Sequence, residues 1–314
     1  MEYRNVGRSG LQVSVAGLGC NNFGMRIDKE QTAVVVNRAL DLGVNLFDTA
    51  NIYGGTKSEE FLGAALGDRR KKVVVATKFV GPAGEGPLYK GASRAATFRA
   101  IEDSLRRLQT DWIDLYQIHF PDVSTPIEET LRALEDLVRQ GKILYYGCSN
   151  FAGWQVAEAQ AITRNQHLSP LISAQNEYNL LDRRIERELV PACQAEGLGI
   201  LPYFPLASGF LSGKYRQGEK PPEGTRIAAW GARGEEILSE HNFAVLSGLE
   251  RFAEERGKSV LDVAIGWLAG HPFVPSVIAG ATKQEQVEQN VKAAEWRLTP
   301  EEMSEIDAIT KRRD

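Results

Sequence analysis

Residues 45–54 read NLFDTANIYG, an apolar run that ends in Asp48 and leads through a short loop to Tyr53. The apolar part predicts a short buried strand. A carboxylate at the end of such a strand is costly to bury unless a cation is its partner. Two later apolar runs end in groups that could meet this need, Lys78 and His119. The pattern raises the hypothesis that these four polar groups meet in space.

The same alternation of apolar strand and amphipathic helix runs through the whole chain. Continuous apolar strands separated by helices indicate a parallel sheet covered by helices. Eight such units favour a closed (β/α)₈ barrel, the TIM barrel, over an open doubly wound sheet. We expect strands at residues 15–19, 44–48, 73–78, 114–119, 144–149, 171–175, 199–203 and 276–280, and helices that begin near residues 28, 57, 94, 125, 152, 183 and 283.

Three additions to the barrel are predicted. Residues 3–15 read as an N-terminal β-hairpin, residues 204–240 form a long loop after the seventh strand, and residues 298–306 form a capped C-terminal helix. Local signals predict a capping box at residues 28–31 and a helix cap at Thr125, with proline in the following first turn. Since no linker interrupts the pattern, residues 1–314 are expected to form a single domain.

Composition excludes several classes of function. The chain has 314 residues, of which 43% are hydrophobic, and a formal net charge of −4, which argues against nucleic acid or a membrane surface as partner. Three cysteines without CxxC spacing and four dispersed histidines support neither a disulfide framework nor a metal site. No apolar run has the length of a signal peptide or a membrane span, so a cytoplasmic location is predicted.

A barrel directs the carboxyl end of every strand to the same rim, where active sites are built. Polar side chains stand at or just beyond these ends in this chain. The barrel fold therefore predicts that they converge. They are Asp48, Lys78, His119, Ser149, Asn150, Gln175 and Tyr203.

The four groups named first suit the reduction of a carbonyl. A phenol titrates near 10 in a model peptide, and a nearby ammonium lowers that pKa. Lys78 is expected to lower the pKa of Tyr53 in this way, with Asp48 holding Lys78 in place. Tyr53 could then protonate a forming alkoxide while His119 donates a hydrogen bond to the same oxygen. The electrons must come from a cofactor.

Taken in order, these segments resemble the aldo-keto reductase family over nearly the whole chain. The long loop and the Gly-Lys-Tyr element are most similar to the bacterial and potassium-channel β-subunit branches. The stretches that carry the likeness are residues 17–19 (GLG), 45–54, 76–78 (ATK), 117–119 (QIH), 147–150 (GCSN), 203–207 (YFPLA), 213–215 (GKY) and 280–282 (GAT).

The resemblance implies a role for each catalytic residue. Tyr53 would be the general acid, Lys78 the residue that modulates its pKa, Asp48 the partner of Lys78, and His119 the donor that orients the carbonyl. It also implies an NADPH cofactor, since Lys283 would favour a 2′-phosphate. The substrate would be a small carbonyl compound.

The resemblance further implies which residues hold that cofactor. Ser149, Asn150 and Gln175 would bind the nicotinamide carboxamide, with Tyr203 beneath the ring and Cys20, Phe204 and Pro205 nearby. Leu206, Ser208 and Lys214 would cover the pyrophosphate, and Arg226 would lie against the adenine. The adenosine end would fall to Gly280, Thr282, Lys283, Gln286, Gln289 and Asn290. Cys20, Phe204 and Gln289 depart from the residues frequent in the family.

Alternative interpretations remain beside this one. Asp48 and Lys78 could form a purely structural ion pair. The protein could instead be a nicotinamide-binding sensor or regulatory subunit, or a phosphate-binding barrel isomerase. His167, His241 and His271 are predicted to lie at the surface, and Trp230 could line the substrate opening. The substrate and the oligomeric state are left open.

Overall fold

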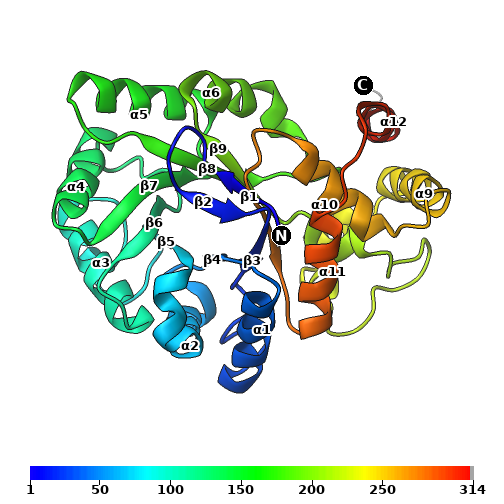
Figure 1. Cartoon of the computed structure of the whole chain (residues 1–314), viewed down its shortest axis with the longest axis horizontal. Coiled ribbons are helices and arrows are strands. Elements are labelled where there is room, and N and C mark those ends of the chain that lie inside the picture. The colour runs from blue at the N-terminus through cyan, green and yellow to red at the C-terminus, as the bar shows by residue number, and fades with distance from the viewer. Residues whose placement is uncertain (312–314) are drawn as a thin grey trace.

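Eight parallel strands form a nearly closed barrel in the computed structural model, which describes residues 1–311 without the side chain of Arg233 (Figure 1). They lie in the order β10-β3-β4-β5-β6-β7-β8-β9. This confirms the predicted (β/α)₈ barrel, with each strand within a residue or two of its expected bounds. The strands are β3 (Ala16–Gly19), β4 (Leu46–Asp48), β5 (Val74–Phe79), β6 (Ile113–Ile118), β7 (Ile143–Ser149), β8 (Leu171–Glu177), β9 (Gly199–Tyr203) and β10 (Val277–Gly280).

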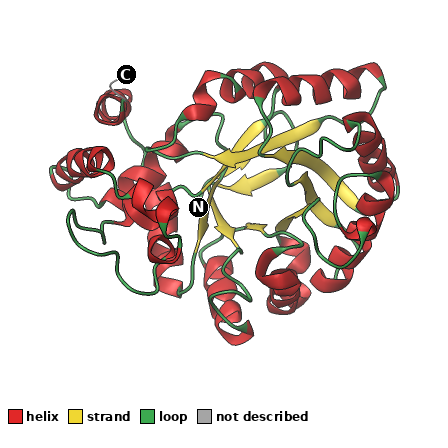
Figure 2. Cartoon of the chain, turned by 180° about the vertical axis from the view of Figure 1, so that it is seen from behind, coloured by secondary structure: helices red, strands yellow, loops and turns green. Residues whose placement is uncertain are grey.

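Helices surround the strands, as the view from behind shows (Figure 2). They are α1 (Lys29–Asp41), α2 (Lys57–Leu66), α3 (Arg94–Leu108), α4 (Ile127–Arg139), α5 (Gly153–Asn165), α6 (Leu189–Glu196), α9 (Glu240–Glu254), α10 (Val260–Gly270), α11 (Gln284–Ala294) and α12 (Pro300–Thr310). The predicted hairpin is present as β1 (Tyr3–Asn5) and β2 (Gln12–Ser14).

Local helix signals are partly wrong. Asp28 accepts a hydrogen bond from the Gln31 backbone, as expected, but the Gln31 side chain donates to the carbonyl of Thr282 instead of closing the capping box. Thr125 donates to Asp122 and does not cap α4. Near residue 183 the chain forms a 3₁₀ turn, and α6 begins only afterwards. In each case a tertiary contact or a short turn replaces the local preference.

An apolar core fills the barrel and is closed at one end by the hairpin. Leu46, Leu115 and Leu201 point inward from three strands and pack with Val6 and Val13 of the hairpin, all five with no more than 1% of their surface exposed. Full burial of such side chains contributes roughly 1.5–3 kcal/mol each. This apolar core therefore separates the hairpin from the polar groups of the site, which lie at the other end of the barrel.

The hairpin turn lies directly against the barrel backbone. Arg8 N donates to the carbonyl of Gly197 at 2.9 Å. Gly7 has φ +56°, and a Cβ at this position would lie 2.3 Å from the same oxygen. Only glycine fits here, so the contact between the hairpin turn and the barrel backbone depends on Gly7.

The barrel closes less regularly between β9 and β10. The two strands are neighbours, yet within the described chain no ladder of backbone hydrogen bonds joins them. Ile200 N in β9 instead donates to the carbonyl of Phe273 at 2.8 Å. The rings of Tyr178 and His271 pack around Trp267, with centroids 5.2 Å and 4.6 Å from its ring. The segment before β10 is thus joined to β9 by a backbone hydrogen bond, and Phe273 of this segment stacks on His271.

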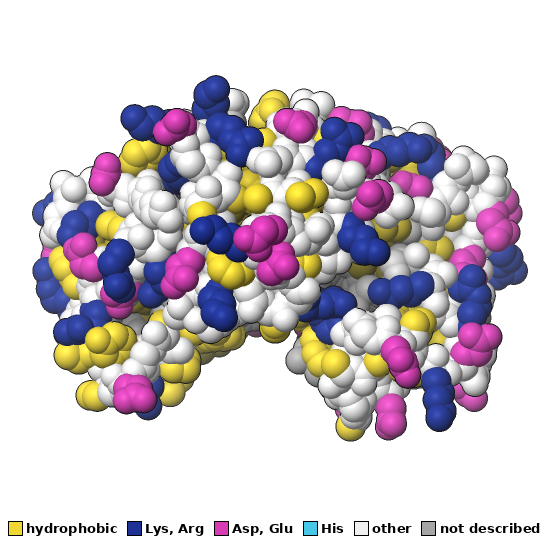
Figure 3. Space-filling view, turned by 90° about the horizontal axis from the view of Figure 1, so that it is seen from below, with side chains coloured by type: hydrophobic (Ala, Val, Ile, Leu, Met, Phe, Trp, Pro, Cys, Tyr) yellow, Lys and Arg dark blue, Asp and Glu magenta, His cyan; other side chains and the backbone are white. Residues whose placement is uncertain are grey.

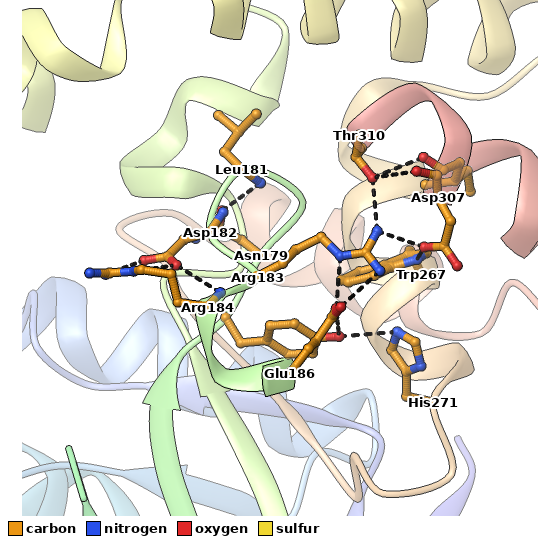
Figure 4. A network of polar contacts seen from close by, with 12 residues as sticks. Asn179, Leu181, Asp182, Arg183, Arg184, Glu186, Trp267, His271, Asp307 and Thr310 are labelled. Carbon is orange, nitrogen blue, oxygen red and sulfur yellow. Dashed lines mark hydrogen bonds and ion pairs between the residues drawn. The ribbon is translucent and has the colours of Figure 1, made fainter. Parts of the chain in front are cut away.

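A polar network joins the segment after β8 to α10 and α12 (Figure 4). Arg183 donates to Glu186 and, through Nη1, to Asp307 at 2.7 Å and to the Thr310 hydroxyl at 2.9 Å. The indole nitrogen of Trp267 donates to the same Asp307 at 3.1 Å. Figure 4 also shows His271 in this network, where its ring lies 3.4 Å from the hydroxyl of Tyr178. His271 is half-buried in this network and therefore less exposed than predicted, whereas His167 and His241 are exposed as predicted.

The long loop after β9 is present as predicted and has structure of its own. It contains a 3₁₀ segment at Ala207–Ser212 and two short helices, α7 (Arg226–Ala229) and α8 (Ala232–Ile237). Among the described residues, no helix has the length and apolar character that a bilayer crossing requires.

Candidate active site

Asp48, Lys78 and Tyr53 meet at the rim of the barrel. Lys78 has no exposed surface, and its ammonium donates to Asp48 Oδ2 at 2.6 Å, to the carbonyl of Thr49 at 2.8 Å and to Tyr53 Oη at 3.5 Å. These are the contacts expected of a buried cation, which must be paired and hydrogen-bonded.

Strand register explains why the three groups converge. Asp48 pairs with Ala76 of the neighbouring strand β5. Lys78 lies two residues further along β5, so its side chain points to the same face as that of Ala76, into the barrel. Tyr53 returns over this pair from a 3₁₀ turn that begins directly after the β4 loop, with Gly54 and Gly55 at positive φ. The sequence placed Lys78 at the strand end, and the structure places it one residue before.

Electrostatics in this group differ from the expectation. Burial lowers the pKa of Lys78, but Asp48 and Tyr53 outweigh it, and the pKa lies above the usual lysine value. Burial raises the pKa of Tyr53, and the opposing effect of Lys78 does not cancel it. The expected net lowering of the tyrosine pKa is therefore wrong. The charge of Lys78 offsets only part of the rise in the Tyr53 pKa that burial causes. Tyr53 therefore holds its proton more firmly than a free phenol does.

His119 follows β6 and stands beside Tyr53. The two rings meet edge to face with centroids 5.8 Å apart, and Phe120 stacks on the imidazole at 4.2 Å. Burial and then the charge of Lys78 lower the pKa of His119 to about 3. Nδ1 is buried and has no hydrogen-bond partner in the part of the chain that the structure describes. The ring is thus neutral at physiological pH and available as a hydrogen-bonding group.

Two glutamines support Asp48 from inside the barrel. Gln175 Nε2 donates to Asp48 Oδ1 at 2.8 Å, and Gln117 Nε2 donates to the same oxygen at 3.3 Å. Gln117 in turn accepts from the Ser173 hydroxyl. Gly147 leaves room for this serine, since a Cβ there would lie 2.1 Å from its oxygen. The amide nitrogen of Gln175, which was expected to bind the nicotinamide, points instead to the carboxylate of Asp48.

Gln117 is a site residue that the sequence reasoning missed. It lies on β6, two residues before His119, and pairs in register with Lys78 of β5. That spacing was the available signal, because the same period of two links Ala76 to Lys78 on the neighbouring strand.

Ser149, Asn150 and Tyr203 form a second polar group beside His119. Asn150 Nδ2 donates to the carbonyl of His119 at 2.9 Å and to Ser149 Oγ at 3.1 Å. Tyr203 donates from its hydroxyl to Asn150 Oδ1 at 2.8 Å. Asn150 adopts φ +61°, a costly conformation that is common at functional sites. The ends of β7 and β9 are therefore joined next to His119.

The start of the long loop continues this strained backbone. Phe204, Ala207 and Ser208 all have positive φ, and the carbonyl of Phe204 accepts from Asn179 Nδ2 at 3.1 Å. The phenyl ring of Phe204 meets Tyr203 edge to face at 5.1 Å. Pro205 and Ser208 are buried and Leu206 is half-buried. These contacts hold residues 204–208 against the rim directly after β9.

Three cations gather where the long loop crosses the rim. Arg226 lies over the rings of Phe204 and Trp230, at 4.9 Å and 6.0 Å. Burial lowers the pKa of Lys214 and of Arg226, and the charge of Arg26 lowers both further. None of the ion pairs described for residues 1–311 joins Arg26, Lys214 or Arg226 to a carboxylate. Sequence reasoning missed Arg26, whose position depends on how two loops fold.

The residues expected at the adenosine end lie around β10 and α11. Thr282 and Lys283 line a surface pocket of about 570 Å³. Gln286 accepts from the Thr282 backbone at 2.7 Å, Asn290 is buried, and Gln289 is exposed.

Gly280 and Cys20 complete the expected set at this part of the rim. A Cβ at Gly280 would lie 3.1 Å from Asn22 Nδ2, so the glycine admits a close approach by the loop after β3. Cys20 lies at the end of that strand with its thiol buried, and burial raises its pKa well above the usual value. Seen from below, the surface is hollowed between two lobes, with Lys and Arg side chains beside the hollow (Figure 3).

Comparison with known proteins agrees with this geometry. A family model described as the Aldo/keto reductase family matches residues 16–311. A probable voltage-gated potassium channel subunit beta of Oryza sativa subsp. japonica is 38% identical over 321 residues, covering 99% of this chain and 97% of the relative. The uncharacterized oxidoreductase YrpG of Bacillus subtilis (strain 168) is 39% identical over 323 residues, covering 98% and 96%. The chain belongs to the aldo/keto reductase family and is an oxidoreductase.

Proposed function

We propose that this protein uses NADPH to reduce aldehydes or ketones to alcohols by hydride transfer. The observation that carries the proposal is the buried contact chain from Asp48 through Lys78 to Tyr53, with a neutral His119 at its open end. Such a chain can deliver one proton to an oxygen without forming a covalent intermediate.

Each residue has a defined task in this proposal. Tyr53 gives its proton to the carbonyl oxygen as negative charge develops there. Lys78 stabilises the phenolate that remains, and Asp48 keeps Lys78 charged inside the barrel. His119 donates a hydrogen bond to the same oxygen, which fixes the direction of the carbonyl. Because Tyr53 keeps its proton up to alkaline pH, it is present as an acid at neutral pH.

The residues around the rim fit a dinucleotide phosphate. The bound cofactor would supply the hydride. Ser149 and Asn150 offer polar groups for a carboxamide, and the Tyr203 ring offers a surface for the nicotinamide. Lys214 and Arg226 are cations without a described carboxylate partner, as phosphates require. Since no linker interrupts the barrel within the described residues 1–311, we also propose that residues 1–314 act as one barrel domain.

The test is steady-state oxidation of NADPH and NADH, run separately against small and aromatic aldehydes. Tyr53→Phe should lower turnover by roughly 10²- to 10⁴-fold, because the proton donor is removed while the ring stays in place. Quenching of tryptophan emission by NADPH should remain in the variant and serves as the folding control. Intact turnover in Tyr53→Phe would refute the mechanism.

The second candidate is a regulatory nicotinamide sensor with little turnover. It is favoured by the relatives of plants and fission yeast that carry the name of a potassium channel beta subunit. Tight NADPH binding by a wild-type protein that oxidises it with none of the aldehydes would select this candidate over the first.

A further inference from the structure

Gln117 is a buried polar side chain that the proposed mechanism does not use. It lies on β6 with no exposed surface, and its neighbours in register are Lys78 of β5 and Gly147 of β7. Leu115, two residues earlier on the same strand, belongs to the apolar core inside the barrel. An amide buried beside apolar side chains is costly unless it is hydrogen-bonded, and an apolar residue would fill the space without that cost. The reason for an amide here must therefore lie in its partners.

Both ends of the Gln117 amide have a partner. Nε2 donates to Asp48 Oδ1 at 3.3 Å, and Oε1 accepts from the Ser173 hydroxyl at 3.3 Å. The serine favours this orientation of the amide, because the reverse one would set the amide oxygen against the carboxylate, and neither has a proton to donate. Ser173 itself fits only because Gly147 has no side chain, since a Cβ there would collide with the serine oxygen. The amide nitrogen is therefore held toward Asp48.

The two carboxylate oxygens of Asp48 have different partners. Oδ2 accepts from Lys78 at 2.6 Å, whereas Oδ1 accepts from Gln175 and Gln117. The terminal torsion of an aspartate is broad, so a carboxylate held at one oxygen can still turn. Donors on the second oxygen fix its plane. The glutamines thereby determine the direction from which Oδ2 meets the ammonium.

The position of Asp48 affects Tyr53 through charge. Lys78 Nζ lies 2.6 Å from Asp48 Oδ2 and 3.5 Å from Tyr53 Oη, so both oxygens compete for the ammonium. Burial raises the pKa of Tyr53 most, the charge of Lys78 lowers it, and the charge of Asp48 raises it. A carboxylate that loses a donor keeps more of its charge and attracts Lys78 more strongly. Both effects raise the Tyr53 pKa further.

We propose that Gln117, oriented by Ser173, is a positioning residue that holds the Asp48 carboxylate against Lys78 and thereby supports proton donation by Tyr53. The inference rests on the proposed function, since it concerns the step in which Tyr53 gives up its proton. Lys78 stabilises the phenolate that this step leaves behind. A misplaced Asp48–Lys78 pair therefore lowers kcat and leaves the binding of substrate unchanged.

A structural role is the competing explanation. Gln117 could matter only because it joins β6 to β8 through Ser173, and its loss would then lower stability without changing the chemistry of the folded protein. Gln160 is a matched control for this role. It is a buried glutamine of α5 whose amide donates to the carbonyl of Leu171 at 3.1 Å and accepts from the backbone nitrogen of Leu171 at 3.0 Å. Leu171 begins β8, so these bonds lie at the opposite end of the strand from the rim.

The experiment measures steady-state oxidation of NADPH by the full chain with whichever small or aromatic aldehyde is reduced fastest. The proteins are wild type, Gln117→Met, Ser173→Ala, the double variant of these two, and Gln160→Met. Gln117→Met should lower kcat roughly 10-fold, because one hydrogen bond to a charged group is lost. KM for the aldehyde and the dissociation constant of NADPH, measured by quenching of tryptophan emission, should stay within about 2-fold. Ser173→Ala should cause a smaller loss of kcat and add nothing in the double variant, and Gln160→Met should keep the wild-type kcat.

The pH profile adds a readout that a structural role does not move. The charged and titratable groups that face Tyr53 are Asp48, Lys78, Cys20, His119 and Arg226. Among these groups, the hydrogen bonds described for Gln117 reach only Asp48. Turnover falls at alkaline pH as Tyr53 loses its proton. This fall should move to higher pH in Gln117→Met and stay in place in Gln160→Met.

The outcomes separate this inference from the proposed function. An unchanged kcat in Gln117→Met, an alkaline fall that stays in place, or losses that add in the double variant would each overturn the positioning role. Turnover by the wild type would leave the proposed function standing in all three cases, whereas a wild type without turnover would overturn both. Should Gln117→Met fail to fold, Ser173→Ala removes only a hydroxyl and must show the loss of kcat and the shift in pH by itself, or the inference fails.

Discussion

Lys78 is a fully buried lysine whose charge is held by a single carboxylate, so each partner depends on the other. Removing one partner of such a pair leaves an uncompensated buried charge and typically costs 3–5 kcal/mol. Lys78→Met should therefore destabilise the protein by about 4 kcal/mol and abolish turnover. Adding Asp48→Asn should restore much of the stability, because the unpaired carboxylate is removed, and none of the turnover. Urea unfolding of the single and double variants measures this, and a double variant that is no more stable than Lys78→Met would contradict the pairing argument.

At the scale of elements, His271 lies in the connection between α10 and β10, where burial opposes its protonation. Burial lowers the pKa of His271 to about 4, with Asp307 and Glu186 opposing and Arg183 adding to the shift. Because its folded pKa lies below the unfolded value of 6.5, the unfolded chain binds the proton first. The contribution of His271 to the free energy of unfolding is therefore present at neutral pH and is lost as the pH falls from about 6.5 toward 4.

The pH dependence of unfolding tests this assignment. Between pH 7 and pH 5, His271 should account for a loss on the order of 2 kcal/mol. His271→Gln should flatten this part of the profile, whatever its effect at pH 7, while the exposed His241→Gln should leave the slope as it is. The remaining acid sensitivity would come from His119, whose pKa is lowered to about 3. Equal slopes in wild type and His271→Gln would rule out His271 as the origin of this pH dependence.

At the scale of the whole molecule, the core inside the barrel depends on how the N-terminal hairpin packs against its end. Gly7→Ala forces a methyl group to within 2.3 Å of the Gly197 carbonyl at φ +56°. The strain and the displaced hairpin should cost about 2 kcal/mol or more. Gly10→Ala is the matched control, because the nearest atom to its Cβ would be 3.9 Å away. The urea midpoint should fall for the first variant and stay near wild type for the second, and similar midpoints would mean that the hairpin is dispensable to the barrel.

The fold and the meeting of Asp48, Lys78 and Tyr53 were predictable from sequence because both follow from periodicity. Asp48 ends β4 and Lys78 is the penultimate residue of β5, and a parallel barrel sends such strand ends to one rim. The rest depends on quantities that periodicity does not contain. The sign of the Tyr53 pKa shift depends on how deeply the phenol is buried, and the role of Gln117 depends on strand register. Arg26 and His271 owe their places to contacts between segments far apart in the chain.

The pairing of β3 with β10 also has a consequence for synthesis. Ala16 lies beside Val277, which leaves the ribosome roughly 260 residues later. Until then one edge of β3 has no neighbour, and an open edge of this kind can pair with another nascent chain. The glycines at 17 and 19 and the brevity of the strand make that edge a poor template. The same small residues that let β3 lie close to β10 would thus limit premature association of the growing polypeptide.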